Sequence, residues 1–367
     1  MLEFIDQELK QAGLHRSLKL VAKSDGHIIE IDGQKLVNFS SNNYLGLANH
    51  PKVIERAAAA LKEFGAGATG SALICGWTKY HEALAQKLAA YKNREAALLF
   101  PTGYQANLGT ITALTGENDT IIIDRLNHAS IIDACHLSKA KLQVYKHRDL
   151  ASLEAVLKRS AKFKKRLIVT DAVFSMDGDL APLAEIVELG KRYDAITMAD
   201  YAHATGVVEL PGKPDLVMGT LSKALGSLGG FVAGEAKLID YLRNKARSFI
   251  YTTALPPSAC AAALAALEVI ETKPEHLLGL QQNISFFTTR YPLSVSPQTP
   301  IIPIIIGDNE KTVQVSKQLY DRGFFVSAIR PPTVPDGEAR LRITITSEQT
   351  KEELECLASS LRELIPA

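Results

Sequence analysis

The stretch "AITMADYAHATG", residues 195–206, decides the fold because an apolar run ends abruptly in polar residues. The run 195–199 is typical of a buried strand, and Asp200 follows it directly, with His203 three residues later. Similar apolar runs are "AALLF" (96–100), "TIIID" (120–124), "RLIVTD" (166–171) and "DLVMGT" (215–220). Helix-like segments such as "APLAEIVELGKRY" (181–193) alternate with them. This alternation predicts an α/β fold in which helices cover both faces of a mainly parallel sheet.

Length and composition narrow the class of protein. The 367 residues suit a large domain with a smaller one attached. A net charge of +1 provides no field that would draw the protein to nucleic acid or acidic lipid. The four cysteines lack a CxxC pair, which favours reduced thiols. Residues 1–20 carry acids and no continuous apolar segment, so they do not resemble a signal peptide. We therefore expect a cytoplasmic protein without nucleic-acid or membrane partners.

Polar residues follow several of the predicted strands, and ligands bind at the carboxyl ends of parallel strands. "LLFPTGYQ" places Gly103 and Tyr104 at the start of a helix, whose free N–H groups form an anion site. "LNHAS" adds His128, and "GTLSKALG" adds Lys223 in a loop of small residues. With Asp200 and His203, these are the groups that pyridoxal phosphate (PLP) uses: an amine, a carboxylate, a flat ring partner and a phosphate site.

Other readings of the same residues stay open at this point. Lys223 alone could be an ordinary solvated lysine. A nucleotide-triphosphate loop requires GxxxxGK[ST], and the neighbours Ser222 and Ala224 do not fit it. Asp200 and His203 could instead be two metal ligands of a hydrolase, although no HExxH or other dense ligand cluster accompanies them.

Five motifs in this order resemble the α-oxoamine synthases, a branch of the fold-type-I PLP-dependent transferases. They are "DRLNHAS" (124–130), "VFSMDGDLAPL" (173–183), "DYAHATGV" (200–207), "GTLSKALG" (219–226) and "RLRIT" (340–344). The resemblance implies a large domain with a mainly parallel seven-stranded sheet flanked by helices, plus a smaller α+β C-terminal domain. It divides the chain into an N-terminal segment (1–45), a large PLP-binding domain (46–272) and a small domain (273–367).

The resemblance also implies roles for single residues. Lys223 would form a Schiff base with the cofactor and later move the α-proton of the substrate. Asp200 would pair with the pyridinium nitrogen. The remaining cofactor contacts that it implies are His128 and Ala202 on the two ring faces, Ser175 and His203 at the phenolic oxygen, and Gly103, Tyr104, Thr220 and, from a second subunit of a homodimer, Thr252 or Thr253 at the phosphate.

The implied reaction condenses L-alanine with a pimeloyl thioester, carried by CoA or by acyl carrier protein, with loss of carbon dioxide. A sister activity that joins glycine to acetyl-CoA would share every cofactor residue. Arg342 would bind the amino-acid carboxylate, because a guanidinium fork matches two oxygens. The other substrate residues that the resemblance implies are Asn42 near the reacting carbon, and Arg16, Arg330 and Thr333 for the acyl chain or its far carboxylate. At two positions the chain departs from the family pattern, with Tyr201 in place of an aspartate and Ala72 in place of an arginine.

Overall fold

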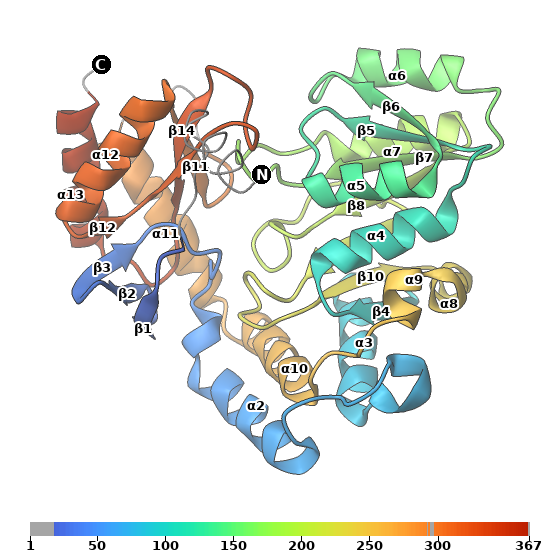
Figure 1. Ribbon diagram of the computed structural model, residues 1–367, viewed down its shortest axis with the longest axis horizontal. Coiled ribbons are helices and arrows are strands. Elements are labelled where there is room, and N and C mark those ends of the chain that lie inside the picture. Colours follow the sequence, from blue (N-terminus) through green and yellow to red (C-terminus); the bar gives the residue numbers. More distant parts are fainter. Residues whose placement is uncertain (1–17, 292, 294–296, 366–367) are drawn as a thin grey trace, which may run out of the picture.

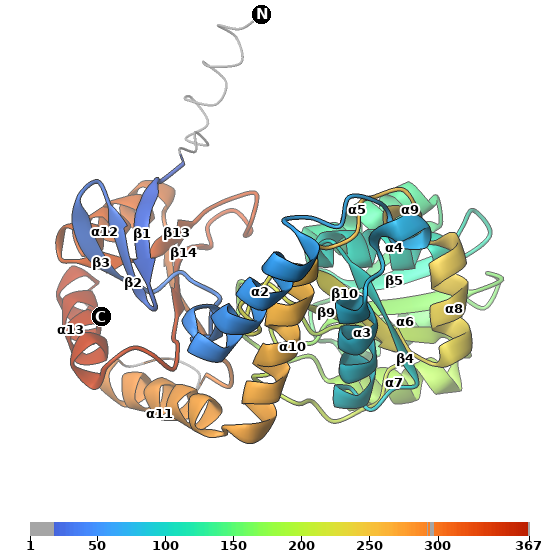
Figure 2. The ribbon, with the colours of Figure 1, turned by 90° about the horizontal axis from the view of Figure 1, so that it is seen from below.

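The computed structural model describes residues 18–291, 293 and 297–365. A large sheet wrapped by helices occupies one side of the molecule, and a smaller body of strands and helices occupies the other (Figure 1). Helices α2 (Pro51–Phe64) and α10 (Pro257–Thr272) pack against each other and lie between the two bodies, as the second view also shows (Figure 2). Residues 259–270, "ACAAALAALEVI", form an alanine-rich run within α10, and most of these alanines are buried.

The large sheet has seven strands in the order β4-β10-β9-β8-β7-β5-β6. All pairs are parallel except those of β10, which runs antiparallel to both β4 and β9. The strands are β4 (Ala96–Phe100), β5 (Thr120–Asp124), β6 (Lys141–Tyr145), β7 (Arg166–Asp171), β8 (Ile196–Asp200), β9 (Leu216–Thr220) and β10 (Gly230–Gly234). Five of them coincide with the predicted runs to within one residue.

Helices cover both faces of this sheet because side chains alternate between the faces along each strand. The helices of this body are α3 (Lys79–Tyr91), α4 (Gly103–Leu114), α5 (Ala129–Ser138), α6 (Leu150–Arg159), α7 (Leu183–Arg192), α8 (Ala236–Lys245) and α9 (Arg247–Ile250). In β4, Leu98 and Phe100 pack in one apolar cluster with α4, α5, α8 and α9, whereas Ala97 and Leu99 join the opposite cluster with α3 and α10. The predicted fold class is confirmed in this respect.

The smaller body combines both ends of the described chain. Its strands form two sheets, with the orders β1-β2-β3-β12 and β11-β14-β13. These strands are β1 (Val21–Asp25), β2 (Ile28–Ile31), β3 (Gln34–Asn38), β11 (Ile301–Gly307), β12 (Phe324–Phe325), β13 (Ser327–Ile329) and β14 (Ala339–Thr344). Helices α11 (Glu275–Arg290), α12 (Asn309–Asp321) and α13 (Lys351–Leu364) complete it. Because β3 pairs with β12, the first strands share a sheet with the C-terminal part; the domain boundaries at residues 45 and 272 remain a prediction.

Candidate active site

Lys223 and His203 meet at the carboxyl ends of the central strands. The Nζ atom of Lys223 lies 2.8 Å from Nε2 of His203. On the other side of the ring, Nδ1 of His203 lies 2.6 Å from the hydroxyl of Tyr44, which donates to Oδ1 of Asn42 at 3.1 Å. If Lys223 donates to Nε2, the imidazole is neutral with its proton on Nδ1. The residues form a chain from the amine to the N-terminal part of the protein.

The surroundings make this amine easy to deprotonate. Burial lowers the pKa of Lys223 to about 8, although the Asp200 and Asp171 carboxylates oppose the shift. Burial also holds the pKa of His203 well below its usual range, and the Lys223 charge adds to that effect. Burial raises the pKa of Tyr44 to about 12. At neutral pH the imidazole therefore accepts a hydrogen bond from the amine and carries no charge itself.

Asp200 ends β8 as a buried carboxylate that is 3% exposed. Its Oδ1 accepts the backbone N–H of Ala202 at 2.8 Å, and its Oδ2 accepts an N–H of Asn107 at 2.9 Å. Asp171 is its register partner on β7, and accepts from Asn127 at 2.7 Å and from the backbone N–H of His128 at 3.0 Å. Burial and the neighbouring Asp200 charge raise the pKa of Asp171 well above its usual range.

His128 caps the N-terminus of α5 and faces a cavity of about 540 Å³. Its Nδ1 lies 2.7 Å from the Ser130 hydroxyl. Desolvation lowers the pKa of His128, and the nearby Lys223 charge lowers it further. The same cavity is lined by Ser175 and by Thr333 of the smaller body, so the structure brings these three predicted residues together.

Gly103, in the first turn of α4, and Thr220 lie side by side, and we call this place the cradle. Thr102 caps the helix by accepting from the Gln105 N–H, and the first N–H groups of a helix have no intrahelical acceptor. A Cβ on Gly103 would lie 3.5 Å from Cβ of Thr220, so the two predicted phosphate residues are neighbours. Gly230 supports this approach, because a Cβ there would lie 2.6 Å from Cα of Gly103.

Arg342 lies buried on β14 and reaches across to the large body. Its Nε donates to the Ser175 carbonyl oxygen at 2.6 Å, and its Nη2 donates to Asn42 Oδ1 at 3.2 Å. The predicted substrate residues Arg342 and Asn42 are therefore in contact with each other, and through Asn42 with the Tyr44–His203–Lys223 chain.

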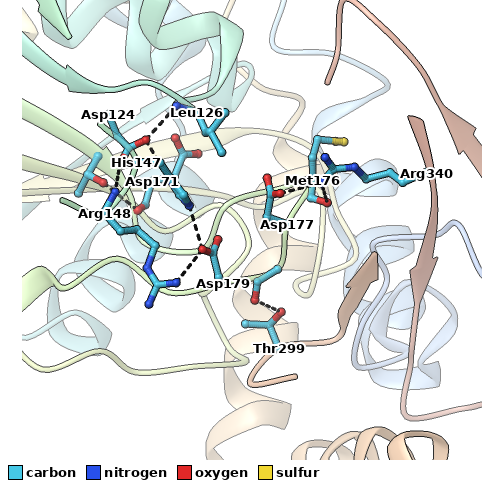
Figure 3. A network of polar contacts seen from close by, with 12 residues as sticks. Asp124, Leu126, His147, Arg148, Asp171, Met176, Asp177, Asp179, Thr299 and Arg340 are labelled. Atoms are coloured by element: carbon cyan, nitrogen blue, oxygen red, sulfur yellow. Dashed lines mark hydrogen bonds and ion pairs between the residues drawn. The ribbon is translucent and has the colours of Figure 1, made fainter. Parts of the chain in front are cut away.

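The loop that carries Ser175 is held by charged groups from both bodies (Figure 3). Arg340 donates to Asp177 at 2.6 Å and to the Met176 carbonyl oxygen at 3.3 Å. On the other side, His147 lies between two carboxylates, with Nδ1 2.9 Å from Asp124 and Nε2 2.9 Å from Asp179. Burial opposes the charge on this ring, but the two hydrogen bonds outweigh it and raise the pKa of His147 to about 9.

The other predicted residues are less concentrated. Tyr104 is an exposed residue, and its hydroxyl donates to Asp133 of α5. Thr252 accepts a long 3.5 Å bond from Gln105, and Thr253 is exposed next to it. Arg330 is half-buried just after β13, and Arg16 lies outside the described residues.

The metal-hydrolase reading finds no support in this geometry. Within residues 18–291, 293 and 297–365, no group of three or more histidine, cysteine, aspartate or glutamate side chains could hold a metal ion. Asp200 accepts from two N–H donors, and His203 Nε2 faces an amine, so hydrogen-bond donors occupy the atoms that would bind a metal.

Comparison with known proteins identifies the family. The model of the family "Aminotransferase class I and II" matches residues 34–361. The chain belongs to this family. Among its relatives, 8-amino-7-oxononanoate synthase 2 of Bacillus subtilis is 45% identical, over 97% of this chain and 95% of the relative. The 8-amino-7-oxononanoate synthase of Marinobacter nauticus is also 45% identical, over 97% and 94% of the two chains.

Solved structures of similar proteins have the same overall architecture as this chain. A variant of the serine palmitoyltransferase from S. paucimobilis, solved with a bound PLP–myriocin aldimine, superposes with a TM-score of 0.92 at 29% identity, covering 99% of this chain and 97% of that one. An 8-amino-7-oxononanoate synthase from Francisella tularensis gives a TM-score of 0.75 at 27% identity, covering 89% and 98%. The resemblance to the α-oxoamine synthases is confirmed, and the two relatives named above are 8-amino-7-oxononanoate synthases.

Three residues of the site were not predicted from the sequence of this chain. Asp171 ends "RLIVTD" just as Asp200 ends "AITMAD", so the same strand-end signal was available for it. Asn107 lies inside a helix, and Tyr44 is 159 residues from His203, so no local pattern marks either as a partner of the site.

We expect the clamp around His147 to make stability depend on pH. Because folding raises this pKa from 6.5 to about 9, its contribution is complete below pH 6.5 and is lost as the pH rises through 9. At 1.36 kcal/mol per unit, the loss amounts to at most about 3 kcal/mol. Urea unfolding at several pH values gives the free energy of unfolding of the wild type and of His147→Gln. The difference between these two free energies should become smaller at high pH. His136→Gln, an exposed histidine on α5, is the control; a constant difference would contradict the clamp.

We also expect the Lys223 amine to react at unusually low pH. Only the neutral amine is nucleophilic, so reductive methylation of Lys223 in the cofactor-free protein should reach half its maximal rate near pH 8. A lysine model peptide should require about pH 10.4. Asp200→Asn should move the midpoint to lower pH, because the carboxylate favours the charged amine. Mass spectrometry of the Lys223 peptide gives the rate, and a midpoint equal to that of the peptide would refute the assignment.

Proposed function

We propose that the protein is a PLP-dependent acyltransferase that condenses L-alanine with a pimeloyl thioester to give 8-amino-7-oxononanoate, carbon dioxide and the free thiol carrier, a reaction of biotin biosynthesis. The observation that carries the proposal is the contact between Lys223 and His203 beside the buried Asp200 carboxylate, in a chain whose relatives are 8-amino-7-oxononanoate synthases. Charge, burial and family therefore agree on one chemistry.

The residues present fit the cofactor. A Gly103–Thr220 cradle at the start of α4 suits a phosphate, since the helix N-terminus offers backbone donors. Asp200 is a carboxylate already held by two N–H donors and suits a pyridinium nitrogen. Lys223 is a half-buried amine with a lowered pKa and suits imine formation. His128 and Ala202 would flank the ring, Ser175 would bond its phenolic oxygen, and Thr252 or Thr253 of a second subunit would complete the phosphate site. His203 would bond the same oxygen through Nε2, as the tautomer protonated there, once Lys223 no longer donates to that atom.

When bound, PLP supplies an aldehyde for an amine and a ring that withdraws electrons from the α-carbon. The chain's own residues supply the proton transfers around it. Lys223 takes the α-proton of alanine on Nζ, which its lowered pKa allows near neutral pH. His203 keeps Nζ in place through Nε2. Arg342 binds the alanine carboxylate with its guanidinium, within reach of Asn42.

The acyl chain of the second substrate would occupy the cavity between the bodies. Its lining combines apolar and polar side chains. The apolar ones include Leu126 and Ile132 from the large body and Val334 from the smaller one, and His128 and Thr333 are among the polar ones. Thr333, with Arg330 and Arg16, would contact the acyl chain or its far carboxylate. CoA and acyl carrier protein are both compatible carriers of the thioester.

We expect the purified protein to develop a visible absorption band with PLP and to release thiol from pimeloyl-CoA with L-alanine. Lys223→Ala should lower kcat at least a thousandfold because it removes the base, whereas Lys237→Ala, an exposed lysine at the start of α8, should not. Acetyl-CoA with glycine is the competing pair. A preference for that pair would replace the proposal with glycine C-acetyltransferase activity, and no visible band would refute the cofactor.

We further propose that the protein is a cytoplasmic homodimer with active sites at the interface. An apolar surface formed by Leu73, Ile74 and Tyr251 is exposed, with Ile74 82% exposed. This surface adjoins the Thr252–Thr253 segment, because the Ala254 N–H donates to the Gly70 carbonyl oxygen at 3.0 Å. In the described part of the chain, no helix combines the length and the apolarity that a membrane crossing requires.

Ile74→Glu should dissociate this dimer, because a carboxylate buried in an apolar interface is costly. We expect half the wild-type mass in light scattering, and at least tenfold weaker PLP binding because each site would lose the partner's threonines. Val144→Glu is a matched control, because Val144 is also an exposed apolar residue and lies on β6, an edge strand of the large sheet. A monomeric wild type would disprove the dimer, and the proposed reaction would still be tested by the absorption band and by thiol release.

A further inference from the structure

Asn107 is a buried side chain of α4 that the proposed chemistry does not use. It is 0% exposed, and its Nδ2 lies 2.9 Å from Oδ2 of Asp200 and 2.9 Å from the Ser130 hydroxyl oxygen. Its own Oδ1 has no hydrogen-bond partner among the described residues. An unsatisfied acceptor is costly at a buried position. What the position supplies is therefore a pair of N–H donors.

The contacts fix the direction of each hydrogen bond. A carboxylate oxygen only accepts, so Asn107 must present its NH2 group to Asp200. The second N–H of Asn107 points to the Ser130 oxygen, which accepts it and keeps its own proton to donate. That hydroxyl lies 2.7 Å from Nδ1 of His128, and the Ser130 backbone N–H points to the same atom at 3.2 Å. Nδ1 is thus an acceptor, and a neutral His128 carries its proton on Nε2.

We propose that Asn107 is a positioning residue that holds the Asp200 carboxylate and, through Ser130, fixes His128 as the tautomer protonated on Nε2. The link to the cofactor rests on the proposed function, in which Asp200 meets the ring nitrogen and His128 meets the ring face. The tautomer does not rest on it. The single amide of Asn107 would fix the Asp200 carboxylate and the His128 imidazole relative to each other, although these two residues follow different strands.

The wild-type protein tests the direction of the bonds. Nitrogen-15 NMR of histidine-labelled protein, with and without PLP, distinguishes a protonated from an unprotonated Nδ1, and His128→Gln assigns the signal. We expect an unprotonated Nδ1 in both samples at neutral pH. A protonated Nδ1 in the cofactor-free protein would overturn the proposal, whatever the protein does with PLP.

Variants test the positioning role. Asn107→Leu removes both donors at similar volume, and should raise the PLP dissociation constant at least tenfold and produce a mixture of His128 tautomers. Thr110→Val is the matched control, because Thr110 lies on the same helix, is 0% exposed and has a hydroxyl without a partner. It should change the dissociation constant less than twofold. Ser130→Ala removes the hydroxyl donor and leaves only the backbone N–H at Nδ1 of His128, so it should raise the share of the other tautomer and leave PLP binding closer to wild type.

The outcomes distinguish a failure of the positioning role of Asn107 from a failure of the proposed function. If Asn107→Leu does not fold, Asn107→Asp preserves the shape and places an acceptor against Asp200, so PLP binding should weaken by the same factor or more. Unchanged PLP binding and an unchanged His128 signal in a folded Asn107 variant would overturn the positioning role. A wild type that binds no PLP but shows the expected tautomer would sink the proposed function and leave the Asn107–Ser130–His128 chain intact.

Discussion

Two carboxylates buried side by side constrain the whole site. Asp171 and Asp200 are register partners on β7 and β8, and each is 3% exposed. Charges in this setting are unfavourable unless donors surround them. Four N–H groups do so, two for each carboxylate, and they come from residues 107, 127, 128 and 202. The fifth contribution is Lys223, whose charge both carboxylates attract. The carboxyl edge of the sheet is organised around satisfying this pair.

The second requirement is that two bodies meet at this edge. Ser175 lies on a loop of the large body, yet Arg340 and Arg342 of β14 bind that loop at Asp177 and at the Ser175 carbonyl oxygen. Residues 42 and 44 enter the site beside them, although they precede the large sheet in sequence. Because β3 pairs with β12, strands β1, β2 and β3 share a sheet with the C-terminal part of the chain and not with the large sheet that they precede. The predicted substrate residues and the predicted cofactor residues therefore come from different parts of the chain.

Local patterns predicted the parts of the protein in which local chemistry dominates. The central strands are continuous apolar runs that end in polar residues, so β5, β7, β8 and β9 could be located together with Asp200 and Lys223. Two strands of the sheet lacked that signal: β6 is partly exposed and reads "KLQVY", and β10 reads "GFVAG", with glycines at both ends. The contacts of Tyr44 and Asn107 depend on how distant segments pack, which no spacing in the sequence encodes.

The division of labour between Lys223 and His203 follows from opposing effects on one amine. Burial favours the neutral amine, and the two carboxylates favour the charged one, so that its pKa settles at about 8. The amine is then mostly charged and held at neutral pH, yet it loses its proton readily. His203 cannot serve as the store for that proton, since burial and the adjacent Lys223 charge both hold its pKa well below the usual range. The imidazole is therefore an acceptor that orients the amine, and in the proposed reaction the base is Lys223 itself.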